Sequence, residues 1–498
     1  MFEDAELGHT LSKQEFDKRL EAVRNGLLEA QYALKESRAF SVVLLMTGVE
    51  GGGRSETVNA LTSWMDPRHV EVNGLGDPSD EELERPRFWR FWRVLPPRGK
   101  IGIFFGSWYT YPIARSALGD KRQWGKLDRR ISEINRFERM LANERTLILK
   151  LWFHLSRKAL RKRQRELKKS PLHRWRLTDR DRNYLKHYDE FSEVAEHTIR
   201  DTSHAHAPWL IVEGSDRRYR EMFVAEELLK AVQARLAAPD AQPSPPAAHV
   251  PSRGVDRSRT VLSELDLTKR LTKSTYEKEL ERAQGALAML SRHKRFMHHS
   301  VVLVFEGNDA AGKGGAIRRV TGAFDSRIVR VVPIAAPTDE EKTHPYLWRF
   351  WRHLPRRNHI VVFDRSWYGR VLVERVENLC TTDDWQRAYS EINDFEEEMT
   401  GHGIVVAKFW LATTKEEQLK RFRQRERVSF KHYKITEEDW RNRKKWNAYA
   451  EAVCDMVART STNRAPWTLV EANDKYYARI KVLKTLRKRI ERALEASS

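Results

Sequence analysis

Short apolar runs alternate along the chain with longer stretches in which apolar residues recur at helical spacing. An amphipathic, highly charged helix is predicted at the start of each half of the chain, over 12–37 and 272–296. The apolar runs predict strands at 41–46, 101–105, 147–153 and 209–213, and again at 300–305, 360–363, 404–411 and 467–471. Continuous apolar strands that alternate with helices are typical of a parallel sheet with helices on both faces, so we expect an α/β fold.

The two sets of elements belong to two copies of one domain. The sequence Trp-Arg-Phe-Trp-Arg begins at Trp89 and again 259 residues later at Trp348. The sequence Ser-Glu-Ile-Asn begins at Ser132 and again 258 residues later at Ser390. Prolines with alanine and serine fill the stretch between the copies and predict an exposed, semi-rigid linker. We therefore predict domains over 1–236 and 259–498 and a linker over 237–258.

The clearest candidate for chemistry follows the apolar run at 300–305. The seven residues from Gly307 to Lys313 read Gly-x-x-x-x-Gly-Lys, with Asn308, Asp309 and Gly312 between the ends. In a P-loop the glycines let backbone N–H groups surround a phosphate chain, while the lysine and the next helix add positive charge. Gly314 stands where serine or threonine would hold Mg²⁺, so metal ligands must come from elsewhere. A glycine turn without a ligand is the alternative, and it leaves the lysine in register unexplained.

The strand predicted at 360–363 is followed by Asp364 and Arg365. An acid at the end of a strand beside a P-loop strand is the usual second ligand of a phosphate-bound Mg²⁺. Together with Asp309, it offers two carboxylates that would replace the missing hydroxyl. Arg365 would stabilise charge that develops on a transferred phosphoryl group. A helix cap is the structural alternative for Asp364.

Two arginine-rich segments are candidates for phosphate binding. Arg349 and Arg352 are three residues apart on an expected helix and would share a face. Solvated arginines beside core tryptophans are the structural alternative there. The segment 420–434 precedes a capping box at Thr436 and predicts a mobile basic lid, with a solvated helix face as its alternative. Its candidate phosphate contacts are Arg421, Arg425 and Lys431.

The composition narrows the class of partner. The net charge of +21, from 91 Lys and Arg against 70 Asp and Glu, predicts a polyanionic partner such as nucleic acid, an acidic membrane surface or a phosphate polymer. No apolar run reaches membrane-spanning length, and the first residues lack the pattern of a secretory signal. The two cysteines, Cys380 and Cys454, form no metal-binding spacing, so we expect a reduced, cytoplasmic setting.

With these motifs in hand, the chain resembles the family-2 polyphosphate kinases, and most closely the two-domain branch, whose members transfer phosphate from polyphosphate to AMP. The specific matches are the loop from Gly307, the segment Phe363-Asp-Arg-Ser-Trp-Tyr-Gly-Arg and Trp348-Arg-Phe-Trp-Arg. The resemblance implies two tandem P-loop kinase-like domains, dependence on Mg²⁺, a basic channel for the polymer and assembly into a homo-oligomer. It assigns catalysis to Asp309, Lys313, Asp364 and Arg365, Mg²⁺ binding to Asp309 and Asp364, and phosphate binding to Gly307, Asn308, Gly312 and Gly314.

The N-terminal copy departs from this pattern at the positions that carry chemistry. Arg54 stands in place of Lys313, and Glu50 in place of Asp309. Phe105 and Gly106 replace Asp364 and Arg365, and a phenylalanine cannot bind Mg²⁺. We therefore predict that only the C-terminal copy is catalytic and that the N-terminal copy is kept as a structural partner.

A nucleic-acid-binding P-loop protein is the alternative function, because high positive charge and interleaved aromatic residues also suit a single strand. A binding module would not require Asp309 and Asp364, and many aromatic residues lie at positions that favour core packing. We therefore expect inorganic polyphosphate and AMP or ADP as partners, and neither nucleic acid nor membrane.

Overall fold

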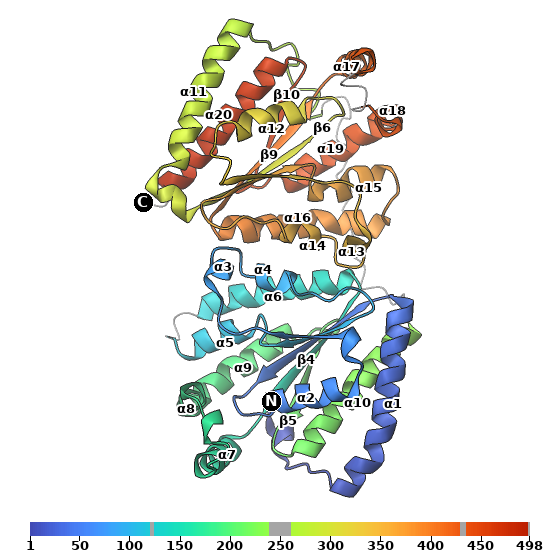
Figure 1. The fold of residues 1–498 in the computed structure, drawn as a ribbon, viewed down its shortest axis with the longest axis vertical. Helices are drawn as coiled ribbons and strands as arrows, with labels where there is room; N and C mark the ends of the chain where they lie inside the picture. Colours follow the sequence, from blue (N-terminus) through green and yellow to red (C-terminus); the bar gives the residue numbers. More distant parts are fainter. Residues whose placement is uncertain (120–123, 239–259, 429–434, 497–498) are drawn as a thin grey trace. The chain divides into compact units, whose positions relative to one another are not determined.

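The chain folds into two compact units in the computed structural model, which describes residues 1–119, 124–238, 260–428 and 435–496 (Figure 1). The N-terminal unit comprises Met1–Pro78, Arg90–Ser244 and Pro337–Trp348, and the C-terminal unit comprises Ser79–Trp89, Pro245–Ala336 and Arg349–Ser498. The predicted linker lies outside the described residues from 239 onward.

Each unit is built on a five-stranded parallel sheet with helices on both faces, as predicted (Figure 1). The order in the N-terminal unit is β2-β3-β1-β4-β5. The C-terminal unit has the same order, β7-β8-β6-β9-β10. The eight predicted strands are β1 (Ser41–Gly48), β3 (Ile101–Phe105), β4 (Thr146–His154), β5 (Trp209–Glu213), β6 (Ser300–Gly307), β8 (Ile360–Asp364), β9 (Ile404–Ala412) and β10 (Trp467–Glu471).

The hydrophobic pattern does not predict the edge strands β2 (Val70–Gly74) and β7 (Val329–Pro333). Three of the five residues of β7 are exposed, and the strand ends in a proline. An edge strand has one neighbour and a solvated side, so its composition need not be apolar. Its position is set by parallel pairing with β8, where Val329 lies opposite Ile360.

The helices follow the same plan in both copies. The predicted first helices are α1 (Lys13–Ser37) and α11 (Lys273–Ser291), the latter followed by a 3₁₀ turn at Lys294–His298. They pack against the last helix of their own copy, α10 (Arg217–Ala237) and α20 (Lys475–Glu495) respectively. The other helices are α2 (Arg54–Trp64), α3 (Asp80–Leu83), α4 (Trp89–Trp92), α5 (Thr110–Ala117), α6 (Trp124–Asn143), α7 (Arg157–Lys169), α8 (Asp179–Lys186), α9 (Tyr188–Thr202), α12 (Lys313–Thr321), α13 (Asp339–Lys342), α14 (Trp348–Trp351), α15 (Val373–Val376), α16 (Thr382–Gly401), α17 (Lys415–Arg427), α18 (Glu437–Lys444) and α19 (Trp446–Thr460).

The sequence Ser-Trp-Tyr occurs at Ser107 and again at Ser366, and its Trp and Tyr residues belong to one buried polar cluster in each unit. The Lys408 ammonium donates to Glu396 at 2.6 Å and to the Tyr368 hydroxyl oxygen at 2.7 Å. Tyr368 and Trp367 donate to the other oxygen of Glu396, at 2.6 and 3.1 Å. Burial lowers the pKa of Lys408 and raises the pKa of Glu396, while their ion pair opposes both shifts. The same cluster in the N-terminal unit is formed by Lys150, Glu138, Tyr109 and Trp108.

We expect Thr460→Val to lower the free energy of unfolding of the C-terminal unit by about 1–3 kcal/mol. The Thr460 hydroxyl accepts the Trp467 indole N–H at 2.9 Å, and valine would leave that buried donor without a partner. Chemical denaturation followed by tryptophan fluorescence measures the change. Thr202→Val is the matched variant, because Thr202 accepts from Trp209 at 2.8 Å in the same way. An unchanged unfolding midpoint in both variants would contradict a structural role for this pair.

Candidate functional site

The glycine loop joins β6 to α12 and is held by the neighbouring strand β9. At Gly307, where φ is 150°, a Cβ would lie 2.5 Å from the Leu411 carbonyl oxygen, so only glycine fits there. The Asn308 side chain accepts the Thr413 backbone N–H at 3.1 Å and fixes the next residue of the loop. Gly312 takes a left-handed conformation, with φ 104°, and caps the N-terminus of α12. The predicted strand, turn and helix are therefore all present.

Lys313 is the first residue of α12, and its ammonium turns back over the loop. It donates to the Gly307 carbonyl oxygen at 2.9 Å. Burial and the neighbouring Arg365 charge lower the pKa of Lys313, while Asp309 and Asp364 raise it. A compact cation at this position is placed to meet phosphate oxygens above the loop.

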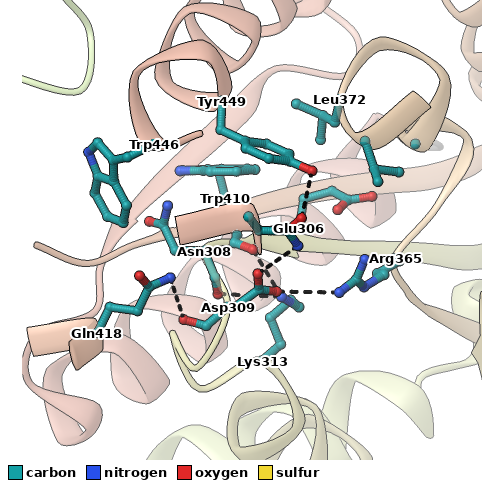
Figure 2. Close-up of a pocket in the computed structure, with 14 residues that line it drawn as sticks. Glu306, Asn308, Asp309, Lys313, Arg365, Leu372, Trp410, Gln418, Trp446 and Tyr449 are labelled. Atoms are coloured by element: carbon teal, nitrogen blue, oxygen red, sulfur yellow. Dashed lines mark hydrogen bonds and ion pairs between the residues drawn. The ribbon is translucent and has the colours of Figure 1, made fainter. Parts of the chain in front are cut away.

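Asp309 and Arg365, both predicted to belong to the site, form an ion pair with each other. Arg365 donates from Nη2 to Asp309 Oδ1 at 3.3 Å. The other oxygen of Asp309 accepts from Asn442 at 2.9 Å, and Asn442 in turn accepts from the Tyr449 hydroxyl at 3.1 Å. Figure 2 shows Asp309 and Arg365 facing each other beside Lys313. The pocket is lined by Glu306, Gly307, Asn308, Asp309, Lys313, Arg365, Gly369, Leu372, Val373, Trp410, Gln418, Asn442, Trp446 and Tyr449.

Asp364 is the last residue of β8 and lies opposite Phe305 of β6, next to the start of the loop. Its carboxylate forms no hydrogen bond or ion pair within the part of the chain that the structure describes. A carboxylate left without a protein partner, close enough to influence Lys313, suits a cation ligand better than a helix cap. At Gly314 an added Cβ would meet no atom within 4 Å. The fold therefore has room for the serine or threonine of the usual P-loop, and steric hindrance does not explain its replacement by glycine.

Arg365 adopts a left-handed backbone conformation, with φ 65°, which is unfavourable for any residue except glycine. The corresponding residue of the N-terminal copy is Gly106, with φ 90°. The same contrast occurs in the loop, where Ala310 has φ 59° and its counterpart Gly51 has φ 79°. The C-terminal copy therefore keeps strained residues at its site where the N-terminal copy has glycine, as expected when strain serves function.

Arg421, predicted to contact phosphate, has a different role in this structure. Its guanidinium supports the glycine loop from within the fold and pairs with Glu417 at 2.8 Å. Its remaining donors bind the carbonyl oxygens of Ala310, Ala311, Ala472 and Asn473, at 3.0, 3.1, 2.7 and 2.8 Å. These bonds use all five N–H donors of the guanidinium, so Arg421 positions the loop and has no donor left for a phosphate.

Of the other predicted phosphate contacts, the three in the described part of the chain do not line the pocket. Arg349 is buried and donates to the Ala335 carbonyl oxygen at 3.0 Å, whereas Arg352 is exposed, so the two do not share one face as expected. Arg425 is half-buried, and burial lowers its pKa. Lys431 lies outside the described residues.

The tryptophans of the same motif, Trp348 and Trp351, are core residues, 5% and 2% exposed. They give no stacking surface for the bases of a single strand, which the alternative nucleic-acid function required of interleaved aromatics.

Across the described residues, no helix is long and apolar enough to cross a bilayer.

Glu306 lines the pocket and was not predicted from the sequence. It is 6% exposed and accepts from the Ser366 hydroxyl at 2.8 Å. Burial raises the pKa of Glu306 to about 6, against the lowering effects of Ser366 and Lys313. The signal that would have found it is the comparison of copies, because Thr47 takes its place beside Ser107 at 3.1 Å in the N-terminal unit. A buried carboxyl is thus specific to the C-terminal site.

In the corresponding loop of the N-terminal unit, the charged side chains are paired with other side chains of the same unit. Arg54 pairs with Glu50 at 2.5 Å and lies over the Phe105 ring, 5.4 Å from its centroid. Arg180 from α8 pairs with the other oxygen of Glu50 at 3.0 Å. Glu50 is therefore neutralised by two arginines, and an aromatic ring, Phe105, occupies the position that Asp364 has in the other copy.

Apolar residues fill the place of the pocket in this unit. At the 258-residue offset, Leu160 replaces Gln418, Tyr184 replaces Asn442 and Phe191 replaces Tyr449. All three N-terminal residues are buried, and the Tyr184 and Phe191 rings stack with centroids 4.3 Å apart. These replacements support the prediction that the N-terminal copy carries out no phosphoryl transfer.

We expect Arg54→Ala to leave the turnover number within about twofold of the wild type, because the side chain is committed to Glu50 and Phe105. Loss of a partly buried ion pair should lower the free energy of unfolding by about 1 kcal/mol or less. Steady-state kinetics and thermal melting measure the two effects, with Lys313→Ala as the matched change in the other copy. A tenfold loss of turnover in a normally folded Arg54→Ala variant would show that this copy does take part in chemistry.

The fold and the loop define the class of protein first. A central parallel strand that runs through a glycine loop into a helix, with a lysine as the first helical residue, is the P-loop kinase-like arrangement. The family model described as polyphosphate kinase 2 (PPK2) matches residues 10–239 and 270–497. The chain belongs to the polyphosphate kinase 2 family.

Full-length relatives share the two-copy layout. The polyphosphate:AMP phosphotransferase of Pseudomonas aeruginosa is 53% identical over 493 residues, which are 99% of each chain. That of Pseudomonas syringae pv. tomato is 50% identical over 498 residues, again 99% of each chain. A crystal structure of a protein assigned to polyphosphate kinase 2 from Pseudomonas aeruginosa PA01 matches with a TM-score of 0.89 and 51% identity, covering 100% of both chains.

Proposed function

We propose that this protein transfers the terminal phosphate of inorganic polyphosphate to AMP, giving ADP, in the pocket of the C-terminal unit. The observation that carries the proposal is the meeting of Asp309, Lys313 and Arg365 in that pocket, while the equivalent place in the N-terminal unit is filled. Support also comes from the full-length relatives at 50–53% identity that are named polyphosphate:AMP phosphotransferases.

The reaction needs positioning and charge rather than a side-chain nucleophile. The end of the polymer would lie over the glycine loop, where Lys313 and the N-terminus of α12 face its oxygens. An oxygen of the AMP phosphate attacks the terminal phosphorus, and the bond from that phosphorus to the bridging oxygen of the chain breaks. The products are ADP and a polymer shorter by one phosphate. Arg365 is placed to stabilise the charge that develops on the group in transfer.

Mg²⁺ is the proposed cofactor, and the donors present fit it. Asp309 and Asp364 supply oxygen ligands, which Mg²⁺ prefers, and the Asp364 carboxylate has no other partner in the described ranges. When bound, Mg²⁺ would neutralise charge on the phosphates. Until then, Arg365 and Asn442 hold the Asp309 carboxylate in place.

Two further expectations remain proposals. Both cysteines, Cys380 and Cys454, are free thiols, which suits a reducing cytoplasm. A homo-oligomer is proposed from the family resemblance, and light scattering of the purified protein tests it.

Nucleotide chromatography tests the proposed reaction. The full chain is mixed with Mg²⁺, AMP and long-chain polyphosphate, with no ATP present, and we expect ADP to form. Omission of polyphosphate is the matched control and should abolish the product. Formation of ADP only when ATP is added would overturn the proposal, because the donor would then be a nucleotide.

A further inference from the structure

The N-terminal unit carries an exposed row of positive charge on α7, although its catalytic loop is degenerate. Six cations lie at i, i+3, i+4, i+7, i+10 and i+11 along this helix, so they share one face. All six are exposed, and none forms an ion pair with a carboxylate in the described part of the chain. We call this row the α7 basic face; it consists of Lys158, Arg161, Lys162, Arg165, Lys168 and Lys169.

The α7 basic face is not a feature that the two copies share, because the corresponding helix of the C-terminal unit, α17, carries less positive charge. Helix α7 contains eight Lys or Arg residues and one Glu, whereas its counterpart α17 contains six basic and three acidic residues. At the 258-residue offset, Lys158, Arg161 and Lys168 correspond to Glu416, Leu419 and Glu426. The copy that lost its chemistry therefore has the more positive helix, which a purely structural role for that copy leaves unexplained.

The position of α7 matches that of the helix that supports the catalytic loop in the other unit. It follows β4 as α17 follows β9, and Arg163 on its flank pairs with Glu56 of α2 at 3.3 Å. Arg157 is paired with Asp189 at 2.6 Å, so these two cations lie outside the basic face. Figure 1 shows α7 and α8 at the edge of the N-terminal unit. The basic face is thus held by the fold and directed to solvent.

We propose that the α7 basic face binds a stretch of inorganic polyphosphate without cleaving it, so that the N-terminal unit holds the polymer while the C-terminal unit transfers its end. This inference rests on the proposed function for the identity of the polymer. The face extends about 16 Å along the helix, at 1.5 Å per residue, and suits a linear polyanion. Helix α7 has no aromatic residue, which distinguishes it from surfaces where cations alternate with stacking rings.

The alternative occupant is a single-stranded nucleic acid. Trp175, in the 3₁₀ turn after α7, is 73% exposed and would offer a base a stacking surface. Because this one aromatic residue lies outside α7, polyphosphate is the proposed ligand, and single-stranded DNA is used as the competitor in the test.

The test replaces three cations of the face with the residues of α17 in the full-length chain: Lys158→Glu, Arg161→Leu and Lys168→Glu. Glutamate and leucine are good helix formers, so α7 should remain folded, and circular dichroism with thermal melting checks this. The matched control makes the same change of charge on α1 and α10 of the same unit, with Lys18→Glu, Arg24→Leu and Lys230→Glu, all at exposed positions.

Binding of polyphosphate of about 100 phosphates is measured directly over a salt series, in the absence of AMP. We expect the Kd of the α7 variant to rise about tenfold, and the slope of log Kd against log salt to fall by about 2, because fewer counterions are released. The control variant should keep the wild-type slope. The KM for this polymer, divided by the KM for tripolyphosphate, should also rise in the α7 variant.

Three outcomes would overturn the inference. The first is that the α7 variant binds long polyphosphate as tightly as the wild type. The second is that the control variant loses as much affinity as the α7 variant, because the effect would then come from the net charge of the protein and not from the α7 basic face. Alternatively, single-stranded DNA of equal charge would displace polyphosphate at an equal or lower concentration. The binding measurement does not depend on catalysis, so it tests the inference even if the protein does not form ADP from AMP.

Discussion

Replacing Lys313 with alanine should lower the turnover number by on the order of 10²-fold or more, because electrostatic stabilisation of the transition state is usually the largest catalytic contribution. The Lys313 ammonium is the cation at the start of α12, and its nearest partners are carbonyl oxygens of the glycine loop rather than carboxylates. Asp364→Asn should produce a loss of similar size, since it removes the charge proposed to bind Mg²⁺ without changing the size of the side chain. Initial rates of ADP formation at saturating AMP and polyphosphate measure both effects.

Lys313→Arg is the informative control, because it reproduces the residue of the N-terminal copy. A planar guanidinium does not replace a compact ammonium in a tight phosphate site, so this variant should stay well below the wild-type rate. Near-wild-type rates in folded Lys313→Ala or Asp364→Asn variants would remove the C-terminal assignment of the active site.

A comparison of Arg365→Ala with Arg365→Gly should separate function from strain. Both changes remove the guanidinium that faces Asp309, so both should lower turnover by about 10²-fold. They differ only in the Cβ at a residue with φ 65°, a conformation that costs an L-residue about 1 kcal/mol relative to glycine. The glycine variant should therefore be the more stable of the two by about that amount, as measured by chemical denaturation.

The corresponding position in the N-terminal copy supplies the matched control. At Gly106 an added Cβ would lie 2.2 Å from the Leu75 carbonyl oxygen, so Gly106→Ala should destabilise its unit without a large change in turnover. Equal stability of Arg365→Ala and Arg365→Gly would show that the backbone at Arg365 is not strained. A wild-type rate in either variant would mean that Arg365 does not act on the transferred group.

The sequence alone predicted the duplication, four strands of each sheet and the strand-loop-helix around Lys313, because each depends on residues close together in the chain. A continuous apolar run reports a buried strand wherever it occurs. Glycines before a lysine report a backbone that must turn tightly. The replacement of predicted site residues by Arg54 and Phe105 was visible for the same reason, since aligned motifs can be compared residue by residue.

Only the tertiary structure decided which polar residues meet at the site. Asn442 and Tyr449 come from α18 and α19, more than 130 residues after Asp309, and no local pattern marks them. Arg421 looked like a phosphate contact because charge was all that the sequence showed. In the structure its guanidinium donates to two carbonyl oxygens of the glycine loop and two that follow β10, which makes it a support. Edge strands such as β7 were missed because pairing with a neighbour, rather than apolar composition, places them. Hydrophobic periodicity fixes which face of an element is buried, whereas packing between distant segments decides which charges are paired and which remain available to a ligand.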